Sequence, residues 1–346
     1  MDQEEPSGAQ VLLELRAREA WNQRDYGQSR VLAEQAAKRA ESTGECDRWW
    51  NMTLLQAECL RKDGLMQESV TVAQTLLDHP LTRKSAAVGA RSYTLLALAL
   101  QGCGNLRQAV IHATQATELA ASVSDHIATQ IEAEHALIAA LAESDQLEDA
   151  WRSCMKLAEL LQREVGAQTA GLGYWAIGNV AYLMHRVEDG TKYHRLAAAS
   201  LSPTNDLDQW ARFNRASAAL RLAAGVVEPE TLECIDRAEM ASSIVGGSDR
   251  DMLELKLTRA HWFVLTGQTD TAIEQLRSIC AKSLILATHT AAEAHFLLGQ
   301  ALKDRQSDLE AVLNFEASEQ LFLQAGAEDR AGSARELITE IQQPAP

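Results

Sequence analysis

Residues 174–203 read YWAIGNVAYLMHRVEDGTKYHRLAAASLSP: an apolar helix-forming stretch, a short polar turn and a second stretch rich in alanine. Gly190, at the start of the second stretch, is one of a series of small residues that return about every forty positions along the chain. The series consists of Ser29, Ser69, Ala109, Ala150, Gly190, Thr231, Ala272 and Ala311. A fixed period of this length predicts a stacked repeat protein, in which each unit buries its apolar face against its neighbours.

Further columns at fixed offsets from these small residues predict two helices in each unit. The position twelve residues earlier is Ala or Gly in seven of the eight units, which allows two helices to cross closely. The positions nine residues before and seven residues after the small residue are apolar almost throughout, so we expect them in the core. A short turn separates the two helices in most units, as in GNLRQAV at 104–110 and GQTDTAI at 267–273.

These small residues and the turn glycine resemble the tetratricopeptide repeat, and residues 174–203 match its pattern best, from Tyr174 and Gly178 to Pro203. The resemblance covers roughly residues 8–325. The unit is longer than the common form of about 34 residues, and it is similar to the long repeats of kinesin light chains and of bacterial signal-responsive transcription activators. A HEAT-like solenoid is the alternative fold, because its units have a comparable length.

The resemblance implies an all-α, right-handed α-solenoid of about eight TPR-like helix pairs, followed by a capping helix. The chain is rich in helix-forming residues, and no segment alternates like a strand. We therefore expect one repeat domain over residues 8–325 and a capping helix at 326–343. The expected units lie near 10–47, 50–85, 88–124, 127–166, 170–203, 208–246, 250–284 and 289–325.

Composition and charge disfavour several classes of function. The formal net charge is -16 and the acidic residues are spread along the chain, so direct binding to nucleic acid is not expected. The longest apolar run is Leu95 to Leu100, so we expect neither a signal peptide nor a membrane span. The six cysteines form no CxxC pair, which favours free thiols in a reducing cytoplasm.

No group of residues predicts catalysis, a metal site or a cofactor. The glycines of GLGYWAIG at 171–178 follow no predicted strand, and His289 and His295 lack partners at metal-ligand spacing. Cys154 and Cys234 lie on apolar faces of second helices, where cysteine packs as a small hydrophobic residue. The sequence therefore favours a protein that is not an enzyme.

In tetratricopeptide arrays the first helix of each unit lines a concave groove, so the resemblance implies binding residues on these helices. Positions 18, 15, 11 and 8 before the small residue are expected to face the groove. In the sixth unit these positions hold Phe213, Ala216, Leu220 and Ala223. Across the array we select as candidate ligand- or peptide-binding residues Arg91, His135, Trp175, Asn179, Tyr182 and His261.

Trp175, Asn179 and Tyr182 lie on one face of a predicted helix, and two interpretations remain open for them. Asn179 can bond to the backbone of a bound peptide while the two rings cover its side chains. Alternatively, the rings pack against the next unit. His135 and His261 likewise either bind a ligand and add pH sensitivity, or are solvated helix residues.

Three functional hypotheses follow. The favoured one is a non-catalytic scaffold or adaptor that binds a protein or peptide segment in its groove. The second is the regulatory domain of a bacterial signalling protein or transcription regulator, which senses a peptide or a small molecule. The third and least favoured is an enzyme. The adjoining rings of Trp49 and Trp50 either take part in a homodimer contact or pack within their own subunit.

Overall fold

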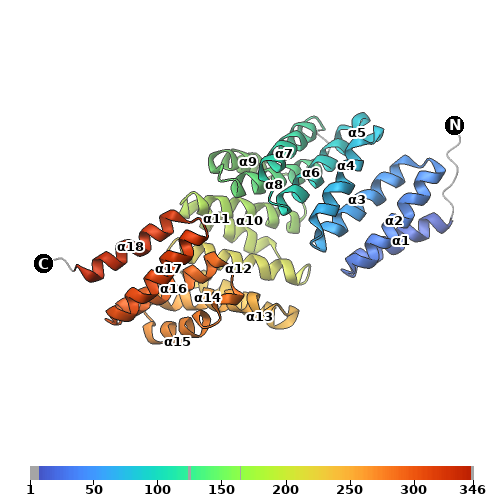
Figure 1. Ribbon diagram of the computed structural model, residues 1–346. Helices are drawn as coiled ribbons and strands as arrows, with labels where there is room; N and C mark the ends of the chain where they lie inside the picture. Colours follow the sequence, from blue (N-terminus) through green and yellow to red (C-terminus); the bar gives the residue numbers. More distant parts are fainter. Residues whose placement is uncertain (1–7, 124–125, 164, 344–346) are drawn as a thin grey trace. The chain divides into compact units, whose positions relative to one another are not determined.

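A computed structural model describes residues 8–123, 126–163 and 165–343, and all regular structure in these ranges is helical (Figure 1). The chain divides into two compact units, Met1–Met184 and His185–Pro346. The division falls inside the fifth predicted repeat, between its two helices. Within the described ranges, no helix combines the length and the apolar character of a membrane span.

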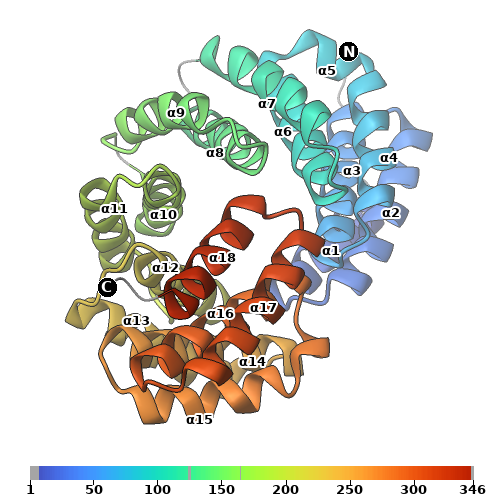
Figure 2. The ribbon, with the colours of Figure 1, turned by 60° about the vertical axis from the view of Figure 1, so that its left-hand side comes forward.

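In the first unit each helix packs against the next along the chain, and Figure 2 shows the pairs α6/α7 and α8/α9 lying side by side. The first helices of successive repeats, α3, α6, α8 and α10, also contact one another in order. The helices are α1 (Gly8–Asn22), α2 (Tyr26–Thr43), α3 (Cys46–Lys62), α4 (Met66–Asp78), α5 (Pro80–Lys84), α6 (Ala86–Gly102), α7 (Leu106–Ala121), α8 (Ile127–Glu143), α9 (Leu147–Leu160) and α10 (Ala167–Leu183).

The second unit repeats this arrangement, with α12, α14 and α16 contacting one another in order and α18 packed on α17. Its helices are α11 (Val187–Ser200), α12 (Leu207–Ala223), α13 (Pro229–Val245), α14 (Asp249–Leu265), α15 (Thr269–Cys280), the 3-10 helix η1 (Ser283–Ile285), α16 (Thr288–Asp304), α17 (Asp308–Gln324) and α18 (Glu328–Gln342). Ala331 and Ala334 of α18 are fully buried, so this last helix covers the apolar face of the final pair.

The forty-residue series marks the crossing of the two helices in each repeat. All eight small residues of the series are buried. In two repeats a hydroxyl of this series bonds directly to the position twelve residues earlier: Ser29 Oγ donates to the carbonyl of Ala17 at 2.8 Å, and Ser69 Oγ to that of Ala57 at 2.9 Å. The predicted close crossing is therefore confirmed, because a larger side chain at either position would separate the helices.

The turn between the two helices uses a left-handed backbone conformation at the same place in seven repeats. Five residues before the small residue, φ lies between 56° and 79°, at Gly64, Gly104 and Gly267 and also at four residues that carry side chains. The four are Arg24, Asp145, His185 and Gln306. Glycine adopts this conformation without strain, whereas other residues do so at a cost. The turn geometry is thus more regular than the glycine pattern in the sequence.

The sixth repeat is shifted by one residue. Its left-handed residue is Gly225, six positions before Thr231, and its second helix begins at Pro229 after a turn over residues 224–228. The corresponding turn of the next repeat covers only residues 266–268. As a consequence Ala218 is buried at the helix crossing, and Ala219, at the predicted offset, is exposed.

Candidate functional site

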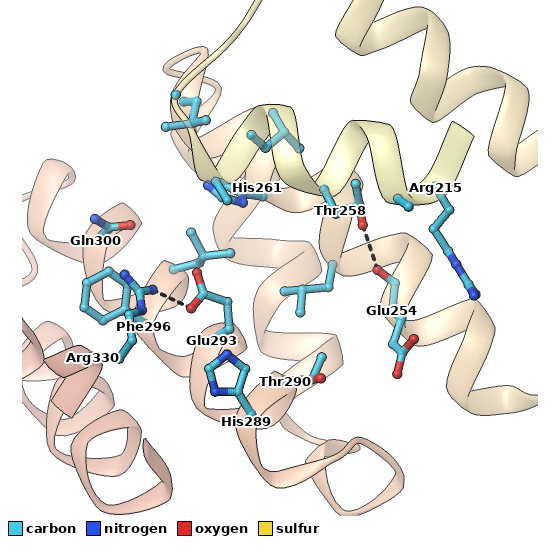
Figure 3. Close-up of a pocket in the computed structure, with 18 residues that line it drawn as sticks. Arg215, Glu254, Thr258, His261, His289, Thr290, Glu293, Phe296, Gln300 and Arg330 are labelled. Atoms are coloured by element: carbon cyan, nitrogen blue, oxygen red, sulfur yellow. Dashed lines mark hydrogen bonds and ion pairs between the residues drawn. The ribbon is translucent and has the colours of Figure 1, made fainter. Parts of the chain in front are cut away.

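The first helices of the repeats enclose two cavities, one within each compact unit. The larger cavity has a volume of about 740 Å³ and lies in the second unit among α12, α14, α16 and α18 (Figure 3). The seventh repeat contributes Glu254, Leu257 and His261, which stand 18, 15 and 11 residues before Ala272. The eighth contributes Glu293, Phe296 and Gln300 at the same three offsets from Ala311.

An ion pair stacked on aromatic rings forms one wall of this larger cavity. Arg330 of α18 donates from Nη2 to Oε2 of Glu293 at 2.5 Å, and Figure 3 shows the two side chains next to the ring of Phe296. The guanidinium carbon of Arg330 lies 4.6 Å from the centre of the Phe296 ring and 5.2 Å from that of Phe322. The rings and the carboxylate together fix the guanidinium in place.

Two histidines add hydrogen-bonding groups to the larger cavity. His261 lies above the space and His289 below it in Figure 3, with Gln300 beside His261. Burial lowers the pKa of His261, and the charge of Glu293 acts in the opposite direction. The neutral imidazole therefore predominates at neutral pH and offers one donor and one acceptor to a ligand.

The smaller cavity, of about 300 Å³, lies in the first unit and is lined by α3, α6, α8 and α10. Its lining residues again occupy the groove offsets of successive repeats: Leu54, Glu58 and Arg61 in the second, Arg91, Thr94 and Leu98 in the third, Glu132 and His135 in the fourth, and Leu172 in the fifth. The cavity therefore combines apolar walls with two guanidinium groups, two carboxyl groups and an imidazole.

The charged groups of the smaller cavity influence one another without forming close pairs. Burial raises the pKa of Glu58, although the nearby Arg61 and Arg91 act in the opposite direction. Burial also lowers the pKa of Arg61. Arg91 lies over the ring of Trp50, with 5.0 Å between its guanidinium carbon and the ring centre. Burial lowers the pKa of His135 as well, which keeps its imidazole neutral at neutral pH.

The six residues selected from the sequence fall into two sets. Arg91 and His135 line the smaller cavity, and His261 lines the larger one. Trp175, Asn179 and Tyr182 line neither of these two cavities of the described residues. Trp175 and Asn179 are partly buried, and Tyr182 is 4% exposed.

The groove positions predicted for the sixth repeat need a correction. Phe213 is 1% exposed and belongs to the interior, and Leu220 lies outside the cavity lining, whereas Arg215 and Ala219 do line the larger cavity. The physical reason is the longer turn before Pro229, which rotates α12 by one residue relative to the repeat pattern. Ala216 and Ala223 still line the cavity as predicted.

Several lining residues were absent from the sequence-based selection. Glu58, Arg61, Glu293 and Phe296 could have been found, because each stands at one of the four groove offsets, 18, 15, 11 or 8 residues before the small residue. Arg330 could not, since it comes from the capping helix, where the repeat offsets do not apply. Only the packing of α18 against the eighth repeat brings its guanidinium to the cavity.

The arrangement of paired helices with regularly spaced groove residues defines the class of fold: an all-α solenoid with repeats of the tetratricopeptide type. No protein-family model matches the chain, and no curated protein matches its sequence. Among solved structures, a Rap protein complexed with competence and sporulation factor matches with a TM-score of 0.56 and 14% sequence identity, over 99% of this chain and 89% of that chain.

Two other solved structures match over similar lengths with lower scores. Yeast Tom70 matches with a TM-score of 0.31 and 10% identity, over 99% of this chain and 98% of that chain. The APC/C hetero-tetramer Cut9-Hcn1 gives a TM-score of 0.25 and 12% identity, over 98% and 95%. The likeness to the Rap protein, at 14% identity, concerns the fold alone.

Proposed function

We propose that this chain is a non-catalytic binding protein that holds a polypeptide segment against the first helices of its repeats, with the larger cavity as the main contact. The observation that carries this proposal is that the residues lining the larger cavity recur at the same positions of successive repeats. The same three offsets of the seventh and eighth repeats supply the walls of the larger cavity, and these offsets define the concave face in tetratricopeptide arrays.

The chemistry of the larger cavity suits a polypeptide. A peptide backbone presents donors and acceptors at short intervals, and His261, His289 and Gln300 provide both kinds of group on the cavity wall. Leu257 and Phe296 supply apolar surface for side chains of the bound segment. Cavities that combine a mainly apolar wall with a few placed polar groups are typical of ligand sites.

Charge balance within the larger cavity adds support. Arg215 and Arg330 stand against Glu254 and Glu293, so its formal charge is zero although the whole chain carries -16. The cavity therefore repels an acidic segment less than the rest of the surface does. The Rap protein of similar fold is complexed with competence and sporulation factor, which supports a binding role for folds of this kind.

A display library of random peptides, selected on the full chain, tests the proposal. Selected peptides are expected to bind the double variant His261→Ala, Glu293→Gln at least about tenfold more weakly in fluorescence polarisation, because hydrogen bonds to a charged group and to a partly buried imidazole are lost. The control is Leu309→Ala, at a residue of α17 that is 87% exposed and lies outside both cavities. If the double variant keeps its helical circular dichroism and binds as tightly as the control, the proposal fails.

Trp175, Asn179 and Tyr182 are a separate part of the proposal. We expect peptides selected on the full chain to include some that bind the first unit at α10, and the double variant Trp175→Ala, Asn179→Ala to lose binding of these peptides while keeping its helix content. An unchanged affinity would restrict the site to the larger cavity and remove these residues from it.

A regulatory domain that senses a small signal is the second candidate function. The smaller cavity favours it, because about 300 Å³ is at the lower end of the range for ligand pockets, about 300–1,000 Å³. Binding there and polypeptide binding at the larger cavity would then be two properties of one regulator.

A further inference from the structure

The smaller cavity gathers four charged side chains, Glu58, Arg61, Arg91 and Glu132. Within the described ranges, the side chains of Glu58, Arg61, Arg91 and Glu132 form no ion pair within 4.0 Å. Elsewhere Arg330 pairs with Glu293, and even the exposed Lys38 pairs with Glu34 at 2.6 Å. Four charges converge on one small space and each has hydrogen-bonding capacity left over.

Thr94, in the wall of the same cavity, has an unused hydroxyl. The residue is 6% exposed, and no described group bonds to its Oγ1. Some helical threonines of this chain donate to the carbonyl four residues earlier, as Thr114 does to Val110 and Thr258 to Glu254. The hydroxyl of Thr94 is therefore available to bond to a group that enters the cavity.

The remainder of the wall is apolar. Leu54, Leu98, Ile131 and Leu172 come from four successive repeats and surround the charged groups. A ligand that fills about 300 Å³ here must therefore carry an apolar part as well as charge. It must also carry both signs of charge, because a purely anionic ligand would leave the carboxyl groups unpaired and a purely cationic one the guanidinium groups.

We propose that the smaller cavity binds a small zwitterion with an apolar side chain, namely an α-amino acid or a dipeptide. The carboxylate of the ligand pairs with Arg61 and Arg91, its ammonium group pairs with Glu58 and Glu132, and its side chain packs against the leucines. This inference rests on the second candidate function, a small signal bound at the smaller cavity, and names its chemical class; it uses residues of the first unit alone and does not require a polypeptide at the larger cavity.

Isothermal titration of the full chain tests this proposal with the twenty standard amino acids and their dipeptides with leucine. We expect at least one zwitterion with an apolar side chain to bind. For leucine as the binder, the decisive analogues are 4-methylpentanoate, which lacks the ammonium group, and 3-methylbutylamine, which lacks the carboxylate. Each is expected to bind at least about tenfold more weakly, since it leaves either the guanidinium groups or the carboxyl groups of the cavity without an oppositely charged partner. The ratio of amino-acid to dipeptide affinity decides which of the two the cavity takes.

Variants locate the site. Glu58→Gln and Arg61→Gln should each weaken the zwitterion at least about tenfold, whereas the second-unit double variant His261→Ala, Glu293→Gln should bind it normally. Thr94→Val should also weaken binding without lowering the unfolding midpoint, because it removes a hydroxyl that has no partner. Thr258→Val is the matched control, since it removes a hydroxyl that is already bonded.

Three outcomes overturn the proposal: no zwitterion of the panel binds up to about 10 mM, the singly charged analogues bind as well as the zwitterion, or Glu58→Gln and Arg61→Gln keep full affinity while folded. Failure of peptide binding at the larger cavity, seen with the peptide library, leaves this result unaffected. The two proposals therefore fail separately.

Discussion

Gly299 lies at a crossing of α16 and α17 where no side chain fits. A Cβ atom added there would lie 2.7 Å from Cε1 and 2.8 Å from Cδ1 of Phe315. Phe315 is fully buried, and its ring contacts the ring of Phe296 edge to face, with 5.6 Å between their centres. The Phe315 ring therefore cannot move away without disturbing a wall of the larger cavity.

Gly299→Ala is consequently expected to be less stable than an alanine substitution at a helical glycine where the added Cβ meets no atom. Alanine gains about 1 kcal/mol over glycine in a helix interior, but overpacking of a core costs about 1–3 kcal/mol. Gly332→Ala in α18 measures the gain from alanine alone, because a Cβ added there meets no atom within 4 Å. The free energy of unfolding of Gly299→Ala should thus lie about 1–3 kcal/mol below that of Gly332→Ala.

Urea unfolding of both variants and of the unchanged chain, followed by far-ultraviolet circular dichroism, measures this difference. Gly332→Ala should unfold at a higher urea concentration than the unchanged chain, and Gly299→Ala at a lower one than Gly332→Ala. If Gly299→Ala is as stable as Gly332→Ala, the two helices do not approach as closely as the structure shows, and the explanation of the small-residue column is refuted.

Three further predictions concern the second unit. Arg330→Gln should lower the free energy of unfolding by about 1 kcal/mol or less, because the ion pair with Glu293 is partly exposed and the stacking on Phe296 adds little more; a loss well above 2 kcal/mol would contradict this estimate. Burial, together with Arg221, lowers the pKa of His194 from 6.5 to about 3, so the fold favours the neutral ring. The contribution of the neutral His194 ring to the free energy of unfolding is complete above pH 6.5 and falls by about 1.4 kcal/mol per pH unit as the pH drops toward 3. The urea midpoint of His194→Gln should not show this part of the pH dependence. Ser248→Ala should cost about 1 kcal/mol in urea unfolding, because its hydroxyl accepts a hydrogen bond from the first turn of α14 at 3.2 Å; an unchanged midpoint would exclude that role.

The offsets taken from the sequence located most of the cavity walls, and the reason is geometric. Residues spaced three or four positions apart share one face of a helix, and stacking of similar helices aligns those faces. Arg91, His135 and His261 therefore lie where the repeat pattern places them. The pattern did not locate Arg215, because a longer turn before Pro229 changes the rotation of α12.

The burial of a groove residue was harder to predict from the sequence than its position on the helix. Tyr182 occupies a groove offset, yet it is 4% exposed. Whether a large ring at such an offset is covered depends on the side chains packed around it, and sequence spacing does not contain that information. The same limit applies to Arg91, whose place over the Trp50 ring depends on a contact between α3 and α6.

The sequence by itself determined the all-α class, the repeat period and the helix face that each repeat turns to its neighbours, because these follow from local periodicity and from small residues at helix crossings. Only the tertiary structure decided which of those faces enclose a cavity and which charges there lack a partner. Ion pairing and enclosure depend on distances between side chains from different repeats, as with Arg330 and Glu293 or with Arg91 and Glu58. The forty-residue period fixes the order of the helices, and packing among them fixes the chemistry that they present.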